Sequence, residues 1–354
     1  MNFVFTGGGT AGHVTPNIAL IPKIQEMGYT VHYIGRYEGI EKDLIENIPG
    51  VIYHGISAGK LRRYSNIKNL TDPFRVIKGY FQALDLIKEI KPEGLFSKGG
   101  FVSVPVVMAA KAHKVPIVIH ESDMTPGLAT KLCLPYAKKA CTTFRATAQG
   151  LGKKGVCTGT PLRDNLFFGS KDIARKKLQL DNKPVILIMG GSLGAKGIND
   201  NIRLVLDRLL PIFNIVHICG NGKKDENINK NGYIQLEYVN EDLPDIMALA
   251  DIVVSRAGSN SINEFLALNK PMLLIPLPAL HSRGDQLVNA DEFESLGYAM
   301  KLLEENITED LLVTFIKDLY DNRAKFIETM KKSGAHKGRD KVLEVIKESI
   351  KKAP

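Results

Sequence analysis

Short runs of apolar and β-branched residues alternate with longer amphipathic segments along the whole chain. Runs such as 115–119 and 184–188 show little polar alternation, which is typical of strands buried on both faces. The predicted strands are 2–6, 30–35, 51–56, 94–97, 116–120, 140–143, 184–189, 214–219, 232–236, 251–255 and 271–275. Amphipathic stretches at 74–90, 196–210, 242–249 and 308–320 are predicted helices. This alternation indicates a doubly wound α/β fold with parallel sheets.

Each half of the sequence begins with a strand that runs into a glycine-rich turn. The first turn is 7–13 and the second is 190–195. The repeat predicts two Rossmann-like domains: residues 1–160 together with a C-terminal segment, 338–354, and residues 161–337. Ligands of such folds bind beyond the carboxyl ends of the strands. We therefore expect the site to lie in a cleft where the two domains face each other.

Composition and charge add a possible partner to this picture. The chain has 354 residues, more than one hydrophobic core usually holds, and 44% of them are apolar. The net charge of +9 is confined to the first half, because residues 1–160 hold 20 Lys and Arg against 11 Asp and Glu, whereas 161–354 hold 27 of each. An anionic partner is expected for the first domain, either an acidic membrane surface or a nucleic acid, unless the excess is only a solvated face.

The first glycine turn, Gly7-x-Gly9-x-x-Gly12, has the spacing of a dinucleotide fingerprint. The next strand ends at Arg36, however, where a dehydrogenase carries Asp or Glu, and the second half shows no hydride-transfer residues. What remains is a turn whose N–H groups can approach an anion. Lys98 opens another glycine turn, 98–101, that suits a second diphosphate. The alternative for each turn is a bare strand–helix connection without a ligand.

The strongest local signal follows the predicted strand 251–255. Ser259, Asn260 and Ser261 come directly after Gly258 and begin a helix whose free N–H groups and positive dipole favour a diphosphate. Glu264, about one and a half turns into that helix, is placed to accept hydrogen bonds from both hydroxyls of a ribose; the alternative is an ordinary helix carboxylate. At a later helix start, the polar residues Asp285, Gln286 and Asn289 suit sugar hydroxyls.

Three side chains near strand ends are candidates for a general base. His13 lies in the first glycine turn, and its intrinsic pKa suits proton abstraction at neutral pH, although a purely structural role is the alternative. Glu121 and Asp123 follow the strand 116–120 and are its rivals. The histidines without a motif around them are expected to be packing or surface residues: His32, His54, His113, His217 and His336.

Cations and apolar side chains are mixed between residues 60 and 81. The mixture comprises Lys60, Arg62, Arg63, Phe74, Arg75, Ile77, Lys78 and Phe81. An apolar patch rimmed by Lys and Arg is typical of a peripheral membrane contact. A core helix is the competing interpretation of 74–90.

Taken in order, the motifs resemble those of glycosyltransferase family 28, a family with the GT-B fold, and in particular its bacterial cell-wall transferases. They are Gly-Gly-Thr-Ala-Gly-His at 8–13, Lys-Gly-Gly-Phe-Val-Ser at 98–103, His-Glu at 120–121, Gly-Thr-Pro-Leu-Arg at 159–163, Gly-Gly-Ser-Leu-Gly-Ala at 190–195, Ser-Arg-Ala-Gly at 255–258 with Glu264, and Asp285-Gln286 with Asn289-Ala290. The set covers essentially the whole chain.

The resemblance implies a set of substrate contacts. A UDP-GlcNAc donor would be bound by Thr10, Ala11, Gly12, Asp123, Arg163, Ser192, Val239, Ser259, Asn260, Ser261, Glu264 and Gln286. An acceptor would be bound by Gly99, Gly100 and Phe101. Two departures from the family pattern matter: Ser122-Asp123 replaces Gln-Asn, so an ionised Asp123 accepts but does not donate, and Phe101 replaces Tyr and lacks its hydroxyl.

The implied reaction is inverting transfer of GlcNAc from UDP-GlcNAc to the C4 hydroxyl of N-acetylmuramoyl-pentapeptide on undecaprenyl diphosphate. His13 is the expected base and Glu121 the alternative. No Asp-x-Asp pair stands near the donor motifs, so we expect no protein-ligated metal and no tightly bound cofactor; whether free Mg²⁺ assists is left open. The implied location is the cytoplasmic face of the cell membrane, as a peripheral protein with an anionic membrane surface and a cell-wall synthesis complex as partners.

Three alternatives remain at this stage. A lipid glycosyltransferase with a diacylglycerol acceptor would keep the donor motifs and change the first half. A UDP-GlcNAc 2-epimerase would share the fold and the donor and would need no acceptor. A nucleic-acid-binding protein would explain the basic half, but it would leave the glycine turns and the ribose carboxylate unexplained, so nucleic acid is not an expected partner.

Overall fold

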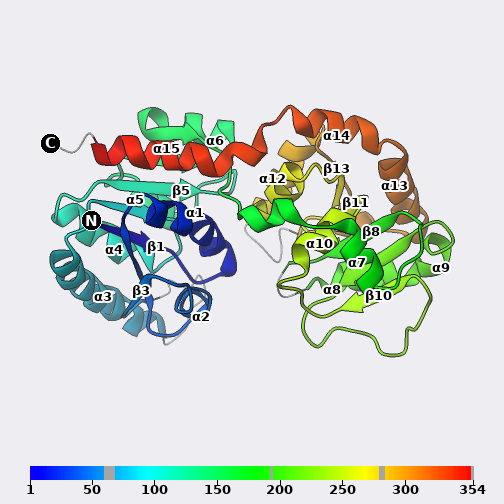
Figure 1. Ribbon diagram of the computed structural model, residues 1–354, viewed down its shortest axis with the longest axis horizontal. Helices are drawn as coiled ribbons and strands as arrows, with labels where there is room; N and C mark the ends of the chain where they lie inside the picture. The colour runs from blue at the N-terminus through cyan, green and yellow to red at the C-terminus, as the bar shows by residue number, and fades with distance from the viewer. Residues whose placement is uncertain (60–67, 192–193, 279–283, 352–354) are drawn as a thin grey trace. The chain divides into compact units, whose positions relative to one another are not determined.

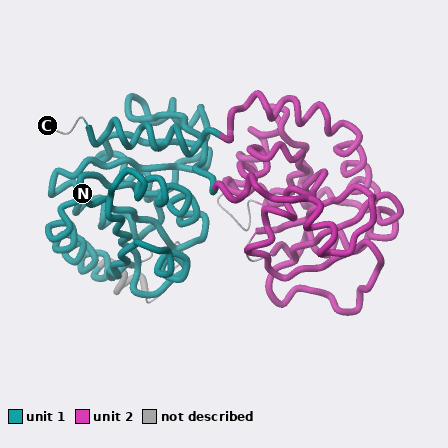
Figure 2. The backbone as a smooth tube through the Cα atoms, viewed as in Figure 1, with its two compact units in different colours: residues 1–163, 337–354 teal, residues 164–336 magenta. Residues whose placement is uncertain are grey.

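The computed structural model describes residues 1–59, 68–191, 194–278 and 284–351, with only the helical backbone for 68–73. The chain divides into two compact units: residues 1–163 with 337–354, and residues 164–336 (Figure 2). The domain boundaries expected from the sequence were 160/161 and 337/338. Figure 1 shows that each unit is a sheet with helices packed on it.

The first unit is built on a seven-stranded parallel sheet with the order β3-β2-β1-β4-β5-β6-β7. Its strands are β1 Asn2–Thr6, β2 Thr30–Arg36, β3 Val51–Ile56, β4 Gly94–Ser97, β5 Ile117–Glu121, β6 Lys139–Thr142 and β7 Gly155–Cys157. Its helices are α1 Thr15–Glu26, α2 Ile40–Ile45, α3 Lys68–Ile90, α4 Ser103–Ala112, α5 Leu128–Cys133, α6 Arg145–Gly150 and α15 Gly338–Lys351, with 3₁₀ turns η1 Ala11–His13 and η2 Gly152–Lys154.

Alternation along β1 explains why helices cover both faces of this sheet. Phe3 and Phe5 are buried with residues of α1 and α15, whereas Val4 between them is buried with residues of α3 and α4. The last helix, α15, contacts β4, β5 and β6 (Figure 1), and Lys138 anchors its end by donating from Nζ to the Ser349 carbonyl at 2.7 Å. Residues from both ends of the chain therefore share one core.

The second unit is a six-stranded parallel sheet with the order β10-β9-β8-β11-β12-β13. Its strands are β8 Val185–Met189, β9 Asn214–Ile218, β10 Tyr233–Leu236, β11 Ile252–Ser255, β12 Met272–Leu274 and β13 Ala299–Lys301. Its helices are α7 Lys171–Lys177, α8 Lys196–Leu204, α9 Leu206–Leu209, α10 Leu243–Leu249, α11 Ser259–Ala267, α12 Asp285–Ser295, α13 Glu309–Asp321 and α14 Arg323–Lys331, with 3₁₀ turns η3 Asp164–Phe168 and η5 Glu304–Asn306; η6 Ala335–Lys337 leads back to α15.

Both sheets confirm the doubly wound prediction, because in each the first strand in sequence lies inside and the order reverses beside it. The eleven predicted strands are present, to within one or two residues at their ends. Two strands were missed, β7 and β13, which are three-residue strands at the sheet edges. The predicted helix 196–210 was wrong in its continuity, since it divides at Val205 into α8 and α9.

Candidate active site

The two glycine turns of the first unit meet at the carboxyl ends of the neighbouring strands β1 and β4. The Gly8 N–H donates to the Gly99 carbonyl at 3.3 Å, and a Cβ on Gly100 would lie 2.1 Å from the Gly8 carbonyl oxygen. Gly9, Gly99 and Gly100 have φ between +84° and +94°, a region that strongly favours glycine. The predicted donor residues of the first turn therefore lie beside the predicted acceptor turn, 99–101.

Two residues that the sequence analysis did not select hold the first turn in place. Glu41 of α2 is fully buried, and its Oε2 accepts the Gly9 N–H at 3.1 Å. Arg36, at the end of β2, donates from Nε to Glu41 Oε1 at 2.6 Å and from Nη2 to Oε2 at 3.2 Å. Burial alone would raise the pKa of Glu41, but the hydrogen bonds from Arg36 and Gly9 outweigh it and hold the pKa below its usual range. Arg36, which stands where a dehydrogenase carries Asp or Glu, is therefore the counterion of Glu41.

His13 ends the 3₁₀ turn η1 and is half-buried beside the turn 98–101. Its Nδ1 lies 2.9 Å from Thr10 Oγ1, and its Cδ2 would be 3.7 Å from a Cβ on Gly99. In the tautomer in which Nδ1–H donates to the Thr10 hydroxyl, Nε2 carries the lone pair that a general base needs. The position is therefore compatible with the predicted role.

Glu121, the rival base, is engaged by its own loop. Oε1 accepts the Asp123 N–H at 3.1 Å, while Oε2 accepts the Gly127 N–H at 2.9 Å and the Thr130 hydroxyl at 2.6 Å. Only 8% of the residue is exposed. A carboxylate with three donors around it is well placed to organise residues 122–130, and the geometry favours that role over proton abstraction.

Lys98 and His120 lie buried behind these turns. Burial lowers the pKa of Lys98, and the negative charges of Glu121 and Asp123 oppose that effect. His120 donates from Nε2 to the Gly159 carbonyl at 2.9 Å, and burial, aided by the charge of Lys98, lowers its pKa to about 3. His120 is therefore neutral, whereas the charges of Glu121 and Asp123 favour the protonated form of Lys98.

In the second unit, α11 begins at the carboxyl end of β11, as the sequence predicted. Gly258 is its N-cap, with φ −69° and ψ 128°, and Ser259 is buried at the first position. Ser259, Asn260 and Ser261 thus form the first turn, and Glu264 is half-buried further along the helix. The N–H groups of that turn and the helix dipole provide a surface for a diphosphate.

Buried polar contacts brace this helix start. Arg256 donates from Nη1 to the carbonyls of Ile275 and Pro276 at 3.1 and 3.2 Å and forms an ion pair with Glu304. Asn289, fully buried in α12, donates to the Ala257 carbonyl at 3.2 Å. The Ser-Arg-Ala-Gly motif therefore holds the backbone through the side chain of its arginine.

The other predicted donor residues are placed as follows. Gln286 accepts the Leu277 N–H at 2.9 Å and so shapes the loop after β12. Val239 lines a cavity of about 180 Å³ between the end of β10, α7 and α10. Arg163 is half-buried at the last residue of the first unit. Ser192 lies outside the described residues.

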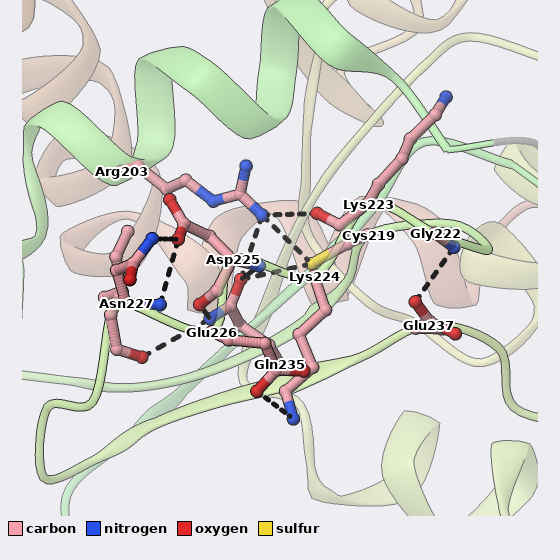
Figure 3. Close-up of polar contacts among 11 residues, drawn as sticks. Arg203, Cys219, Gly222, Lys223, Lys224, Asp225, Glu226, Asn227, Gln235 and Glu237 are labelled. Carbon is pink, nitrogen blue, oxygen red and sulfur yellow. Dashed lines mark hydrogen bonds and ion pairs between the residues drawn. The ribbon is translucent and has the colours of Figure 1, made fainter.

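Arg203 of α8, which the sequence analysis also missed, ties the loop after β9 to β10 (Figure 3). Its Nη2 donates to the Lys223 carbonyl at 2.6 Å and to Gln235 Oε1 at 2.9 Å, and it lies 3.8 Å from Cys219 Sγ. A Cβ on Gly194 would meet the Cys219 carbonyl at 1.8 Å, so this network lies directly against the second glycine turn. No local motif indicates this network, because the partners of Arg203 lie in the loop after β9 and in β10, 16 to 32 residues away along the chain.

Three of the histidines without a motif also have defined partners. His217 is buried, with Nε2 3.0 Å from Asn199 Oδ1 and Nδ1 2.9 Å from the Tyr233 hydroxyl. Burial lowers the pKa of His217 to about 3, so it is neutral at pH 7. His32 and His54 stack with their ring planes 18° apart.

Comparison with known proteins defines the class. The glycosyltransferase family 28 N-terminal domain matches residues 3–142 and the C-terminal domain of the same family matches 185–346. Among solved structures, MurG of Acinetobacter baumannii superposes with a TM-score of 0.77 at 24% identity, covering 98% of this chain and 99% of that one. UDP-GlcNAc 2-epimerase of Neisseria meningitidis superposes with a TM-score of 0.70 at 14% identity, covering 100% of both chains. The protein therefore has the GT-B fold.

Its relatives are similar over their whole length. A protein of Clostridium tetani, named UDP-N-acetylglucosamine–N-acetylmuramyl-(pentapeptide) pyrophosphoryl-undecaprenol N-acetylglucosamine transferase, is 53% identical over 346 residues, which are 97% of this chain and 96% of that protein. A protein of the same name from Lachnoclostridium phytofermentans is 53% identical over 351 residues, 98% of each. This chain belongs to glycosyltransferase family 28.

Proposed function

We propose that this enzyme transfers GlcNAc from UDP-GlcNAc to undecaprenyl-diphosphate-linked N-acetylmuramoyl-pentapeptide, converting lipid I to lipid II in peptidoglycan synthesis. The observation that carries the proposal is identity of 52–53% over nearly the full length to proteins that bear this activity in their name. Similarity throughout both units covers the donor motifs and the first-unit turns alike. It therefore favours this acceptor over diacylglycerol, and transfer over epimerisation.

We propose that the reaction is a single inverting displacement. His13 is proposed to take the proton from the acceptor C4 hydroxyl while the first turn of α11 binds the donor diphosphate. Arg163 and Ser192 are proposed to balance the charge of departing UDP, and Glu264 to bind the ribose. In this proposal no protein-ligated metal takes part, and assistance by free Mg²⁺ is left to experiment.

A direct assay tests the proposal. The protein is incubated with UDP-GlcNAc and a lipid I analogue, and disaccharide product and UDP are quantified together. We expect equal amounts of both, and little UDP when the acceptor is omitted. UDP release without disaccharide would favour the epimerase alternative, and transfer to diacylglycerol would favour the other lipid transferase.

We further propose that the first unit docks peripherally on the anionic cytoplasmic face of the membrane, where cell-wall synthesis complexes assemble. None of the helices in the described ranges has the length and apolar character needed to cross a bilayer. The sequence left two interpretations of 74–90, a core helix and a membrane contact, and different residues of α3 support each. Ala83 and Ile87 are buried in the core, as in a core helix. Phe74, Ile77 and Phe81 are 74%, 53% and 60% exposed, as a membrane contact requires. Arg75 and Lys78 lie exposed beside them, while Lys60, Arg62 and Arg63 lie outside the described residues.

Vesicle binding tests the docking surface. Replacing Phe74, Ile77 and Phe81 together by Ser should weaken binding to anionic vesicles by tenfold or more, since each apolar side chain gains about 1.5–3 kcal/mol on burial. Replacing Arg75 and Lys78 by Ser should cost about 1 kcal/mol per residue and reduce the salt dependence. Phe168→Ser, which changes an 81% exposed residue of the second unit, is the matched control. Unchanged binding by the α3 variants would contradict the proposal.

A further inference from the structure

The Arg36–Glu41 ion pair contacts both glycine turns of the first unit. Glu41 accepts the N–H of Gly9 in the first turn. The guanidinium carbon of Arg36 lies 5.2 Å from the ring centroid of Phe101 in the turn 98–101. The pair itself is bidentate, and the side chain of Glu41 is fully buried while that of Arg36 is 29% exposed. One ion pair therefore joins α2, the end of β2 and both turns.

Close packing makes the turns depend on this pair. A Cβ on Gly8 would lie 2.5 Å from the carboxyl carbon of Glu41, and a Cβ on Gly9 would lie 2.8 Å from the Phe101 ring. The Glu41 carboxylate thus packs against Gly8 of the first turn, and the Phe101 ring packs against Gly9. Since Gly9 has φ +88°, a conformation that glycine enters and leaves easily, these contacts decide which conformation it keeps.

The pair is an inefficient way to stabilise the fold alone. A buried carboxylate must recover its desolvation cost from its partners, and apolar residues of similar size often stabilise a protein as well. What an ion pair with fixed hydrogen bonds adds is direction. Here that direction aims one carboxylate oxygen at the Gly9 N–H and the guanidinium at the Phe101 ring.

We infer that Arg36 and Glu41 are positioning residues for the acceptor, acting through Gly9 and Phe101 without touching the substrate. The inference rests on the proposed function, in which the turn 99–101 binds the acceptor and His13 activates it. Loss of the pair would let the first turn and the Phe101 ring shift relative to each other. A misplacement of about 1 Å can cost a hundredfold in rate.

Steady-state kinetics with a soluble lipid I analogue tests the inference. Arg36→Met and Glu41→Gln should lower kcat over acceptor KM by about tenfold to a hundredfold. Their affinity for UDP should stay within about twofold of wild type, because the ribose and the diphosphate are assigned to Glu264 and to the first turn of α11 in the second unit. Arg36→Lys keeps the charge but loses the planar fork, and it should recover only part of the activity. Glu46→Gln breaks the exposed Lys42–Glu46 pair on the same helix and should match wild type.

A double-mutant cycle separates positioning from stability. Arg36→Met and Phe101→Leu should be non-additive in kcat over acceptor KM, because both remove the same contact. Acceptor kinetics of Arg36→Met and Glu41→Gln within twofold of wild type would overturn the inference. So would a parallel loss of melting temperature, UDP affinity and turnover that Arg36→Lys restores in full. A wild-type protein that forms no disaccharide would overturn the proposed function and this inference together, whereas an active wild type with insensitive variants overturns the inference alone.

Discussion

Substituting Glu121 by Gln distinguishes an organising carboxylate from a catalytic base. Three donors face the Glu121 oxygens: the Asp123 N–H on Oε1, and the Gly127 N–H and Thr130 hydroxyl on Oε2. In the best arrangement the amide oxygen replaces Oε2, and the new NH₂ group faces the Asp123 N–H. One donor is then unsatisfied and the two remaining bonds lose their charge assistance.

The expected cost is about 1–3 kcal/mol of unfolding free energy, the range for one buried donor left without its partner. For a unit of this size that corresponds to a fall in melting temperature of about 2–4 °C per kcal/mol. Because the carboxylate is directed at its own loop, kcat should fall by less than a hundredfold. The acidic limb of the pH–rate profile should keep its position, since the group that titrates there is unchanged.

Calorimetry and a pH–rate series on Glu121→Gln measure both effects. Thr130→Val is the matched control, because it removes one donor from Oε2 and leaves the carboxyl group of Glu121 in place. It should lower stability by about 1 kcal/mol and leave turnover nearly intact. Loss of turnover by 10²–10⁴ in a Glu121→Gln protein of unchanged stability, with the acidic limb abolished, would refute the reasoning and make Glu121 the base.

The remaining predictions address the other candidate residues. His13→Ala should lower kcat by about 10²–10⁴ with donor KM within a few-fold; a collapse of donor affinity would instead make His13 a substrate ligand. Glu264→Gln should raise the donor KM about tenfold, through loss of charge-assisted bonds to the ribose, and an unchanged KM would contradict that role. His217 has its pKa lowered from 6.5 to about 3, so its contribution to stability is complete above pH 6.5 and declines as the pH falls toward 3. Urea unfolding should therefore show an unfolding free energy about 2 kcal/mol lower at pH 5 than at pH 7, and this loss should be absent in His217→Gln. An equal loss of unfolding free energy in both proteins would exclude the assignment.

The fold was predictable because its strands are apolar runs closed by turn residues. β1, β3 and β4 have the predicted bounds. β7 and β13 were missed because neither lies in a longer apolar run such as 271–275, which contains the equally short β12. Pairing with β6 and β12 makes them strands. The helix 196–210 was predicted as continuous because its apolar period runs through Val205, where the chain nevertheless breaks into a second short helix.

The candidate site was predictable only where a motif lies within a few consecutive residues. The turns at 7–13 and 98–101 and the helix start at 259 are examples. Glu41 was missed because an acid in the first turn of a helix looks like an ordinary dipole partner. Arg203 was missed because it takes its partners from residues 16 or more positions away. His217, expected to be a packing or surface residue, is a buried packing residue, and its polar partners are as distant along the chain. The only available signal for Glu41 was indirect, namely an arginine where the glycine fingerprint calls for an acid.

The two units share a strand order but fix their glycine turns with different chemistry. In the first unit a buried ion pair, Arg36 with Glu41, holds Gly9 from the side. In the second unit Asn199 donates to the Cys219 carbonyl at 2.9 Å, and neutral His217 orients Asn199 in turn. Donors fixed before the substrate arrives need no reorganisation during the reaction, so the buried residues behind a turn contribute to its function. Substitution of the buried residues that hold these turns should therefore reduce turnover in either unit.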